Sequence, residues 1–116
     1  MRIRSEAHAR FIRQLPCVVC LARGLFNDVQ TEFTHIRFAD AALAKPESGQ
    51  GIKPDDYWTL PQCSRHHREQ TNFGDEREWW RLVGVDPLKL ALRLWSVTGD
   101  YDAATKIVAA ALRIQR

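Results

Sequence analysis

Apolar side chains recur at helical spacing near the N-terminus of the chain. Four of them stand four residues apart: Ile3, Ala7, Phe11 and Leu15. This spacing predicts an amphipathic helix over residues 5–15 with these side chains on its buried face. Ser5 is a suitable N-cap for the helix, and Pro16 ends it because proline has no amide hydrogen to donate.

The middle of the chain carries two β-prone stretches. Residues 29–38 alternate imperfectly, which predicts a strand whose C-terminal end is its better-defined part. Residues 57–60 are rich in aromatic and β-branched side chains and predict a second short strand. Pro61 marks a turn after it, and a helix is expected from Cys63 to about residue 73, where Gly74 ends it.

The segment between the two strands, residues 39–56, contains glycines and prolines and predicts an irregular loop with one helical turn at its start. Long loops in compact domains often have a functional role. This one carries Lys45 and Lys53. We therefore expect a basic surface loop that could close on a phosphate backbone, or that could serve only as a spacer.

Helical spacing returns in the last third of the chain. A helix is expected over residues 76–83, with Trp79 and Trp80 packing in the core. Asp86-Pro87 is a strong signal for the start of the next helix, and residues 99–100 separate it from the last one. Their apolar stripes are Leu88, Ala91, Leu92 and Trp95, then Tyr101, Ala104, Ile107, Val108, Ala111 and Leu112.

These patterns predict an α+β fold in one domain. It consists of an N-terminal helix (5–15), a strand–loop–strand–helix core (17–74) and a C-terminal helical extension (75–116). The 116 residues, 45% of them apolar, suit a single globular unit. No apolar run approaches the roughly 20 residues that span a bilayer, and none near the N-terminus is of the signal-peptide kind. We expect a cytoplasmic protein without a membrane partner.

The net charge is +3, and its distribution is uneven. The first 24 residues contain five arginines and one acid, Glu6. This excess suits a polyanionic partner such as a nucleic acid. It suits equally a solvated helix face whose arginine stems cover apolar surface.

The cysteines and histidines hold the chain's candidate chemistry. Three cysteines cannot all form disulfides, and no βαβ pattern supports a thioredoxin-like role for Cys17-x-x-Cys20. Structural zinc needs four nitrogen or sulfur ligands, and Cys63 is the third. Buried thiols that act only as small apolar groups are the alternative.

The fourth zinc ligand must be a histidine. His66 stands at Cys-x-x-His spacing from Cys63, which is the spacing of a zinc knuckle, and we assign it as the ligand. His67 then lies about 100° further round the helix and points away from the zinc. An exchange of these two histidines is the open alternative. Gly24 permits the positive φ that closes the turn after Cys20.

Two other zinc proteins are excluded by spacing. A two-Cys two-His finger fails because Ala39, Asp40 and Ala41 stand where a histidine would have to follow His35. A zinc deaminase fails because its His-x-Glu and Pro-Cys-x-x-Cys motifs are absent from the sequence.

Two histidines remain once the four zinc ligands have been assigned: His35 and His67. Because neither is needed to bind the structural zinc, we interpret them as a general base and a ligand for a second metal. Phosphodiester hydrolysis needs these two groups, since a neutral imidazole activates water and a divalent ion neutralises charge on the transition state.

The motifs at residues 34–37, 53–61 and 63–69, together with residues 79–88, resemble the HNH (ββα-metal, His-Me finger) endonucleases. Within that superfamily they are similar to the small phage and prophage nucleases of the RecA-dependent, Ref-like group. The resemblance covers roughly residues 8 to 98 and implies a zinc-stapled ββα-metal core within residues 17–74. It also implies DNA as substrate and a recombinase filament as a further partner.

The resemblance also implies roles for individual residues. His35 would be the general base, His67 the ligand of a catalytic Mg²⁺ or Mn²⁺, and Asp56 would take the place of the asparagine that braces the base. DNA contacts are expected from the basic residues in and beside these motifs: Arg37, Lys45, Lys53 and Arg68.

Two alternatives to a nuclease stay open. Thr34 stands where many HNH enzymes have a metal-binding aspartate, and Gln70 or Thr71 where a further histidine or asparagine often helps. This leaves few ligands for a second metal and favours a non-catalytic, zinc-stapled module that binds nucleic acid or protein. A metal-free, toxin-like helical protein is the third possibility. The sequence leaves open the strandedness of the DNA, any sequence preference and the oligomeric state.

Overall fold

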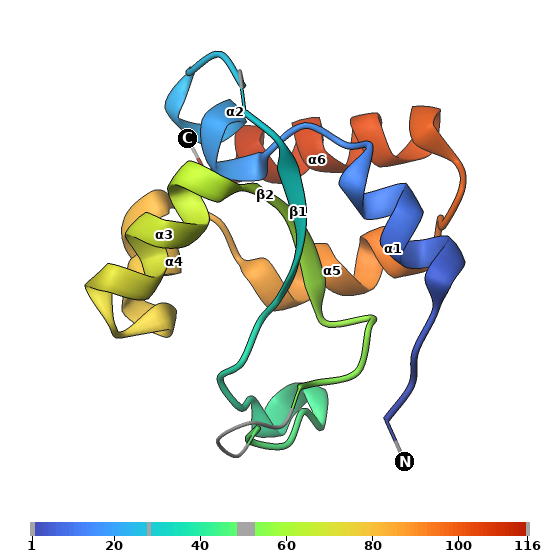
Figure 1. The fold of residues 1–116 in the computed structure, drawn as a ribbon, viewed down its shortest axis with the longest axis vertical. Coiled ribbons are helices and arrows are strands. Elements are labelled where there is room, and N and C mark those ends of the chain that lie inside the picture. The colour runs from blue at the N-terminus through green and yellow to red at the C-terminus, as the bar shows by residue number, and fades with distance from the viewer. Residues whose placement is uncertain (1, 28, 49–52, 116) are drawn as a thin grey trace.

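The computed structural model describes residues 2–27, 29–48 and 53–115 and shows an α+β fold with a small two-stranded sheet (Figure 1). The elements in chain order are α1 (Glu6–Arg13), α2 (Val18–Arg23), β1 (Thr31–His35), the 3₁₀ turn η1 (Ala41–Leu43), β2 (Thr59–Cys63), α3 (Ser64–Phe73), α4 (Glu76–Val83), α5 (Pro87–Trp95) and α6 (Tyr101–Gln115).

The antiparallel pair β1–β2 lies at the centre of the molecule, and the helices surround it. Thr31 lies opposite Cys63 at one end of the pair, and His35 lies opposite Thr59 at the other. In Figure 1, α1 lies on one side of the strands, α3 and α4 lie on the other, and α5 and α6 lie behind them. No helix in the described part of the chain is long and apolar enough to cross a bilayer.

The second strand begins and ends later than its sequence predicts. It covers Thr59–Cys63 instead of residues 57–60, and Pro61 lies inside it, opposite Phe33, instead of marking a turn. Each strand of a two-stranded sheet has one edge without a neighbour, so proline is tolerated at a position whose amide would face outward. The helix therefore follows the strand directly, with Cys63 as its N-cap.

The predicted helix boundaries are largely confirmed. The Ser5 side chain accepts a hydrogen bond from the His8 amide and caps α1. Gly24 has the predicted positive φ, at 69°, and ends α2, a short helix that the sequence did not predict. Helix α4 occupies the predicted residues 76–83, and α5 begins at Pro87 behind its N-cap Asp86.

The predicted buried face of α1 is confirmed at Phe11 and Leu15 but is wrong at its other two positions. Ala7 is exposed and Ile3 is 47% exposed, whereas His8 and Ile12 are fully buried beside Phe11. The reason lies in the contacts that His8 makes with residues distant in the sequence. The His8 ring lies against aromatic neighbours, with its centroid 4.8 Å from Trp95, and its Nδ1 is 2.8 Å from the Thr98 hydroxyl. This partner allows an imidazole to be buried.

The core behind the strands is built largely from the C-terminal helices. Trp79 and Trp80 are 2% and 1% exposed, as the packing role predicted for them requires. On α5 the buried face includes Leu90 and Leu94 as well as the predicted Leu88 and Ala91. The predicted stripe positions Leu92 and Trp95 are only partly buried.

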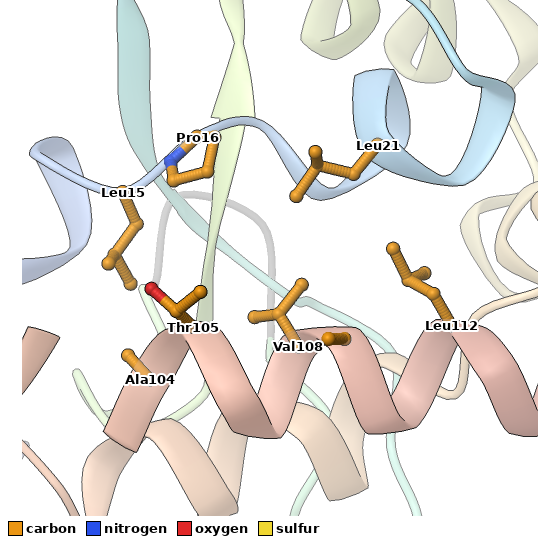
Figure 2. Close-up of a pocket in the computed structure, with 8 residues that line it drawn as sticks. Leu15, Pro16, Leu21, Ala104, Thr105, Val108 and Leu112 are labelled. Atoms are coloured by element: carbon orange, nitrogen blue, oxygen red, sulfur yellow. The ribbon is translucent and has the colours of Figure 1, made fainter. Parts of the chain in front are cut away.

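Helix α6 leaves an apolar groove of about 340 Å³ between itself and the segment that joins α1 to α2 (Figure 2). Ala104, Val108 and Leu112 of α6 line it from one side, and Leu15 and Leu21 line it from the other. The predicted apolar stripe of α6 therefore faces the N-terminal part of the chain and is incompletely covered by it.

Candidate functional site

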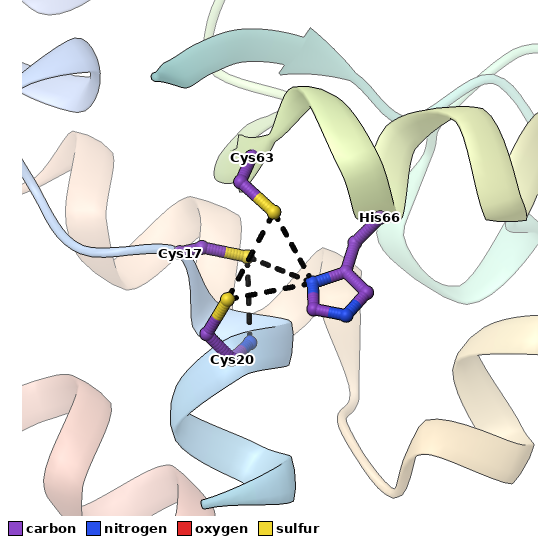
Figure 3. A group of neighbouring side chains, drawn as sticks. All are labelled: Cys17, Cys20, Cys63 and His66. Atoms are coloured by element: carbon purple, nitrogen blue, oxygen red, sulfur yellow. Dashed lines mark hydrogen bonds between the residues drawn. The ribbon is translucent and has the colours of Figure 1, made fainter. Parts of the chain in front are cut away.

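Three cysteines and one histidine come together where α2 meets the start of α3 (Figure 3). Cys17 is the N-cap of α2 and Cys20 lies in its first turn, while Cys63 ends β2 and His66 lies in the first turn of α3. All four side chains are buried, and their ligand atoms lie within 4.8 Å of one another.

Four of the six distances within this Cys₃His cluster are close to those of a tetrahedral site. Cys20 Sγ is 3.8 Å from Cys63 Sγ. The Nδ1 atom of His66 is 3.2 Å from Cys63 Sγ, 3.5 Å from Cys20 Sγ and 3.7 Å from Cys17 Sγ. Tetrahedral zinc with ordinary bond lengths separates its sulfurs by about 3.8 Å and sulfur from nitrogen by about 3.6 Å. The cluster could therefore hold a zinc ion.

The electrostatics of the cluster also fit a cation. Burial, with the neighbouring thiols Cys17 and Cys63, raises the pKa of Cys20 to about 12. Burial likewise raises the pKa of Cys17, whose sulfur accepts a hydrogen bond from the Cys20 amide. Thiolates packed together repel one another, and a divalent ion removes that repulsion because it binds the deprotonated form.

A salt bridge next to the cluster joins three helices. Arg23 at the end of α2 donates two hydrogen bonds to the Glu69 carboxylate of α3, at 2.7 and 3.0 Å. The Trp79 indole of α4 donates to the same carboxylate at 3.0 Å. Glu69 is not identifiable as a site residue from a motif; the available signal in the sequence is its position three residues after His66, on the same face of the helix.

His66, and not His67, belongs to the cluster, as the Cys-x-x-His spacing predicted. His67 lies outside it and its Nδ1 is 2.7 Å from Glu32 Oε1 of β1, with both side chains about 40% exposed. Glu32 is a second residue that the sequence analysis missed. Nothing in the sequence signalled that it would face α3, apart from strand alternation.

His35 forms a separate pair with Asp56. The His35 Nε2 atom is 2.9 Å from Asp56 Oδ1, and the two side chains are 12% and 7% exposed. The other carboxylate oxygen of Asp56 accepts the Ser5 amide at 2.8 Å. The structure thus brings together two residues, 21 positions apart, that were predicted to act together.

Burial and hydrogen bonds together determine the charge state of this pair. Burial lowers the pKa of His35 below the ordinary 6.5, although Asp56 opposes this, so the imidazole is neutral at neutral pH. Burial works to raise the pKa of Asp56, but the Ser5 amide and His35 together hold it below its usual value. A neutral imidazole that donates from Nε2 to a carboxylate keeps the lone pair of Nδ1 for a proton.

The two histidines outside the cluster do not meet. His35 and Glu32, the partner of His67, are three residues apart in β1, and side chains an odd number of positions apart leave a strand on opposite faces. The contacts of the described residues contain none between His35 and His67. The expected approach of His67 to His35 is therefore absent from this structure.

The four basic residues expected to contact DNA differ in their exposure to solvent. Arg37, Lys53 and Arg68 are exposed. Lys45 is only 3% exposed, and its Nζ donates to the Phe38 carbonyl at 2.6 Å, so it is not the surface lysine that the loop composition predicted. Part of the loop, residues 49–52, lies outside the described residues.

Comparison of the chain with family models, with curated proteins and with solved structures produced no match.

Proposed function

We propose that this chain is a zinc-stapled, metal-dependent DNA endonuclease of the HNH type. The observation that carries the proposal is the His35–Asp56 pair, a shielded neutral imidazole held by a carboxylate at the end of β1. Such a pair is the arrangement that general-base catalysis uses. The Cys₃His cluster would hold structural zinc and keep β2 and α3 in place relative to α2.

In this mechanism His35 Nδ1 takes a proton from the attacking water. Asp56 keeps the proton of the imidazole on Nε2 and stabilises the imidazolium that forms, as an orienting carboxylate does. When bound, Mg²⁺ or Mn²⁺ would supply charge neutralisation at the phosphate. His67, the ligand expected from the sequence, is paired with Glu32 on the other face of β1 and takes no part in this step. The exposed Arg37, Lys53 and Arg68 would contact backbone phosphates.

One observation favours the alternative, a non-catalytic, zinc-stapled module that binds nucleic acid. His35 and His67 leave β1 on opposite faces, and each is occupied by a carboxylate, Asp56 or Glu32. In that case both pairs serve only to tie neighbouring segments to the strands. The alternative predicts salt-dependent DNA binding without cleavage under any divalent ion.

Cleavage of labelled single-stranded and double-stranded DNA, with Mg²⁺ or Mn²⁺ and with or without a recombinase filament, separates the two functions. We expect wild-type protein to cut at least one of these substrates. His35→Ala should lose about 100-fold or more in rate, because a positioned general base contributes that much.

His67→Ala is the matched control, because it removes an imidazole from the other face of β1, and it should cut DNA as fast as wild type. Zinc content and circular dichroism should be unchanged in both variants. If His35→Ala cuts as fast as wild type, His35 is not the base. DNA binding by wild-type protein without cleavage under every condition supports the binding module.

A further inference from the structure

A small cavity is lined by Asp55, the sequence neighbour of Asp56, and by charged residues from distant parts of the chain. Its volume is about 220 Å³, less than the roughly 300 Å³ at which sites for whole small molecules begin. The residues of its wall that carry charge or a donor are Arg2, Lys45, Glu47, Ser48, Lys53, Asp55 and Trp58. It is large enough for a phosphate group.

Two residues of the wall present buried donors. Lys45, 3% exposed, has its Nζ 5.9 Å from the centre of the Trp58 ring. Trp58 is also 3% exposed, and its indole Nε1–H has no hydrogen-bond partner among the described residues. Burial raises the pKa of Tyr57, whose hydroxyl donates to Asp55 at 3.0 Å, and the nearby indole N–H opposes that rise without forming a hydrogen bond. A buried donor of this kind can accept a partner from outside the described residues, either a water molecule or a ligand oxygen.

The charge balance of the cavity favours an anion. Three cationic side chains face two carboxylates, and one of these, Asp55, already accepts hydrogen bonds from the Ile3 amide and the Tyr57 hydroxyl. Arg2 and Lys53 also act on the His35 imidazole, where their positive charges contribute to its lowered pKa. The cations of the cavity therefore lie within electrostatic reach of the candidate base.

We propose that this cavity binds a phosphate group, and that in the substrate this is a backbone phosphate next to the one hydrolysed at His35. Arg2 and Lys53 would bind its oxygens from the cavity mouth, and the Trp58 indole would donate a hydrogen bond from the wall. The second half of the proposal rests on the proposed nuclease function. The first half, phosphate binding, does not.

The test observes the Trp58 indole directly. The chain contains four tryptophans, and the indole N–H signal of Trp58 in a ¹H–¹⁵N spectrum is assigned as the one lost in Trp58→Phe. Titration with inorganic phosphate, and separately with a single-stranded DNA oligonucleotide, should shift this signal more than the other three. The two ligands distinguish a site for free phosphate from one that needs a nucleic-acid backbone.

Lys53→Gln should weaken phosphate binding about tenfold, since it removes a charge-assisted contact. It should also lower the slope of log affinity for DNA against log salt concentration by about one. Lys89→Gln, an exposed lysine of α5 that changes net charge equally, is the matched control and should leave phosphate binding unchanged.

The possible outcomes separate the cavity from the nuclease. The proposed phosphate site is wrong if neither phosphate nor DNA shifts the Trp58 signal, or if Lys53→Gln and Lys89→Gln weaken binding equally. This holds even when wild-type protein cuts DNA. If the Trp58 signal moves and Lys53→Gln abolishes the effect, the site stands even when no DNA is cut.

Discussion

At the scale of single residues, the four histidines of this chain occupy four different environments. His8 is fully buried beside Thr98, and His66 completes the cysteine cluster. His35 is paired with a buried carboxylate, while His67 is paired with an exposed one. Because the ordinary pKa of histidine lies near neutral pH, each environment has a different consequence for stability or chemistry.

His8 makes the stability of the protein dependent on pH. Burial lowers the pKa of His8 to about 4 from 6.5 in the unfolded chain, and the charge of Asp56 only partly opposes this. Between these two pKa values the unfolded chain therefore binds a proton that the folded protein does not. Stability falls as the pH falls through this range. Between pH 7 and pH 5, protonation of this residue in the unfolded chain should lower the free energy of unfolding by about 2 kcal/mol.

Urea unfolding of wild type and His8→Leu at pH 7 and pH 5 measures this effect. We expect the free energy of unfolding to fall by about 2 kcal/mol more in wild type than in the variant over that interval. Loss of metal at low pH affects both proteins and cancels in the difference. Equal losses in the two proteins would rule His8 out as the source of the pH dependence.

At the scale of elements, side-chain caps begin several of the helices. Asp75 accepts the Glu78 amide at the start of α4, and Asp86 accepts the Lys89 amide at the start of α5. These bonds satisfy amides that have no partner inside the helix. They explain why the boundaries of the C-terminal helices follow from local sequence.

Asp86→Ala should therefore lower the free energy of unfolding by about 1 kcal/mol, because it removes the cap of α5. Chemical denaturation measures the change. Asp102→Ala is the control, since Asp102 forms an exposed ion pair with Lys106 and its loss should cost less than about 0.5 kcal/mol. A loss of similar size in both variants would show that the cap adds nothing beyond surface charge.

At the scale of the whole molecule, the Cys₃His cluster joins parts of the chain that are far apart in sequence. Cys17 and Cys20 belong to α2, whereas Cys63 and His66 lie more than 40 residues later, where β2 passes into α3. The Arg23–Glu69 salt bridge reinforces this junction from its exposed side. A metal bound there would contribute its binding free energy to folding.

We expect purified protein to contain about one zinc ion per chain and to unfold at a lower temperature after treatment with a strong chelator. Cys63→Ser and His66→Ala should lose the zinc, whereas His67→Ala should keep it. Elemental analysis and thermal melts provide the measurements. Retention of zinc by His66→Ala together with its loss in His67→Ala would exchange the roles of the two histidines.

The sequence alone determined the order and type of most elements and the members of the metal cluster. Helix caps, prolines and glycines act through local backbone geometry, so the start of α5 at Pro87 and the stop at Gly24 are visible without a structure. The four cluster residues were found because zinc requires nitrogen and sulfur ligands at short, recognisable spacings.

Only the tertiary structure decided how the strands pair and what each polar side chain faces. The burial of His8, the position of Pro61 inside β2 and the burial of Lys45 all depend on neighbours that are distant in sequence. The same is true of the separation of His35 from His67, because side-chain direction alternates along a strand and a one-residue change of register reverses it. Spacing identifies candidate ligands, but only packing shows whether they face one another.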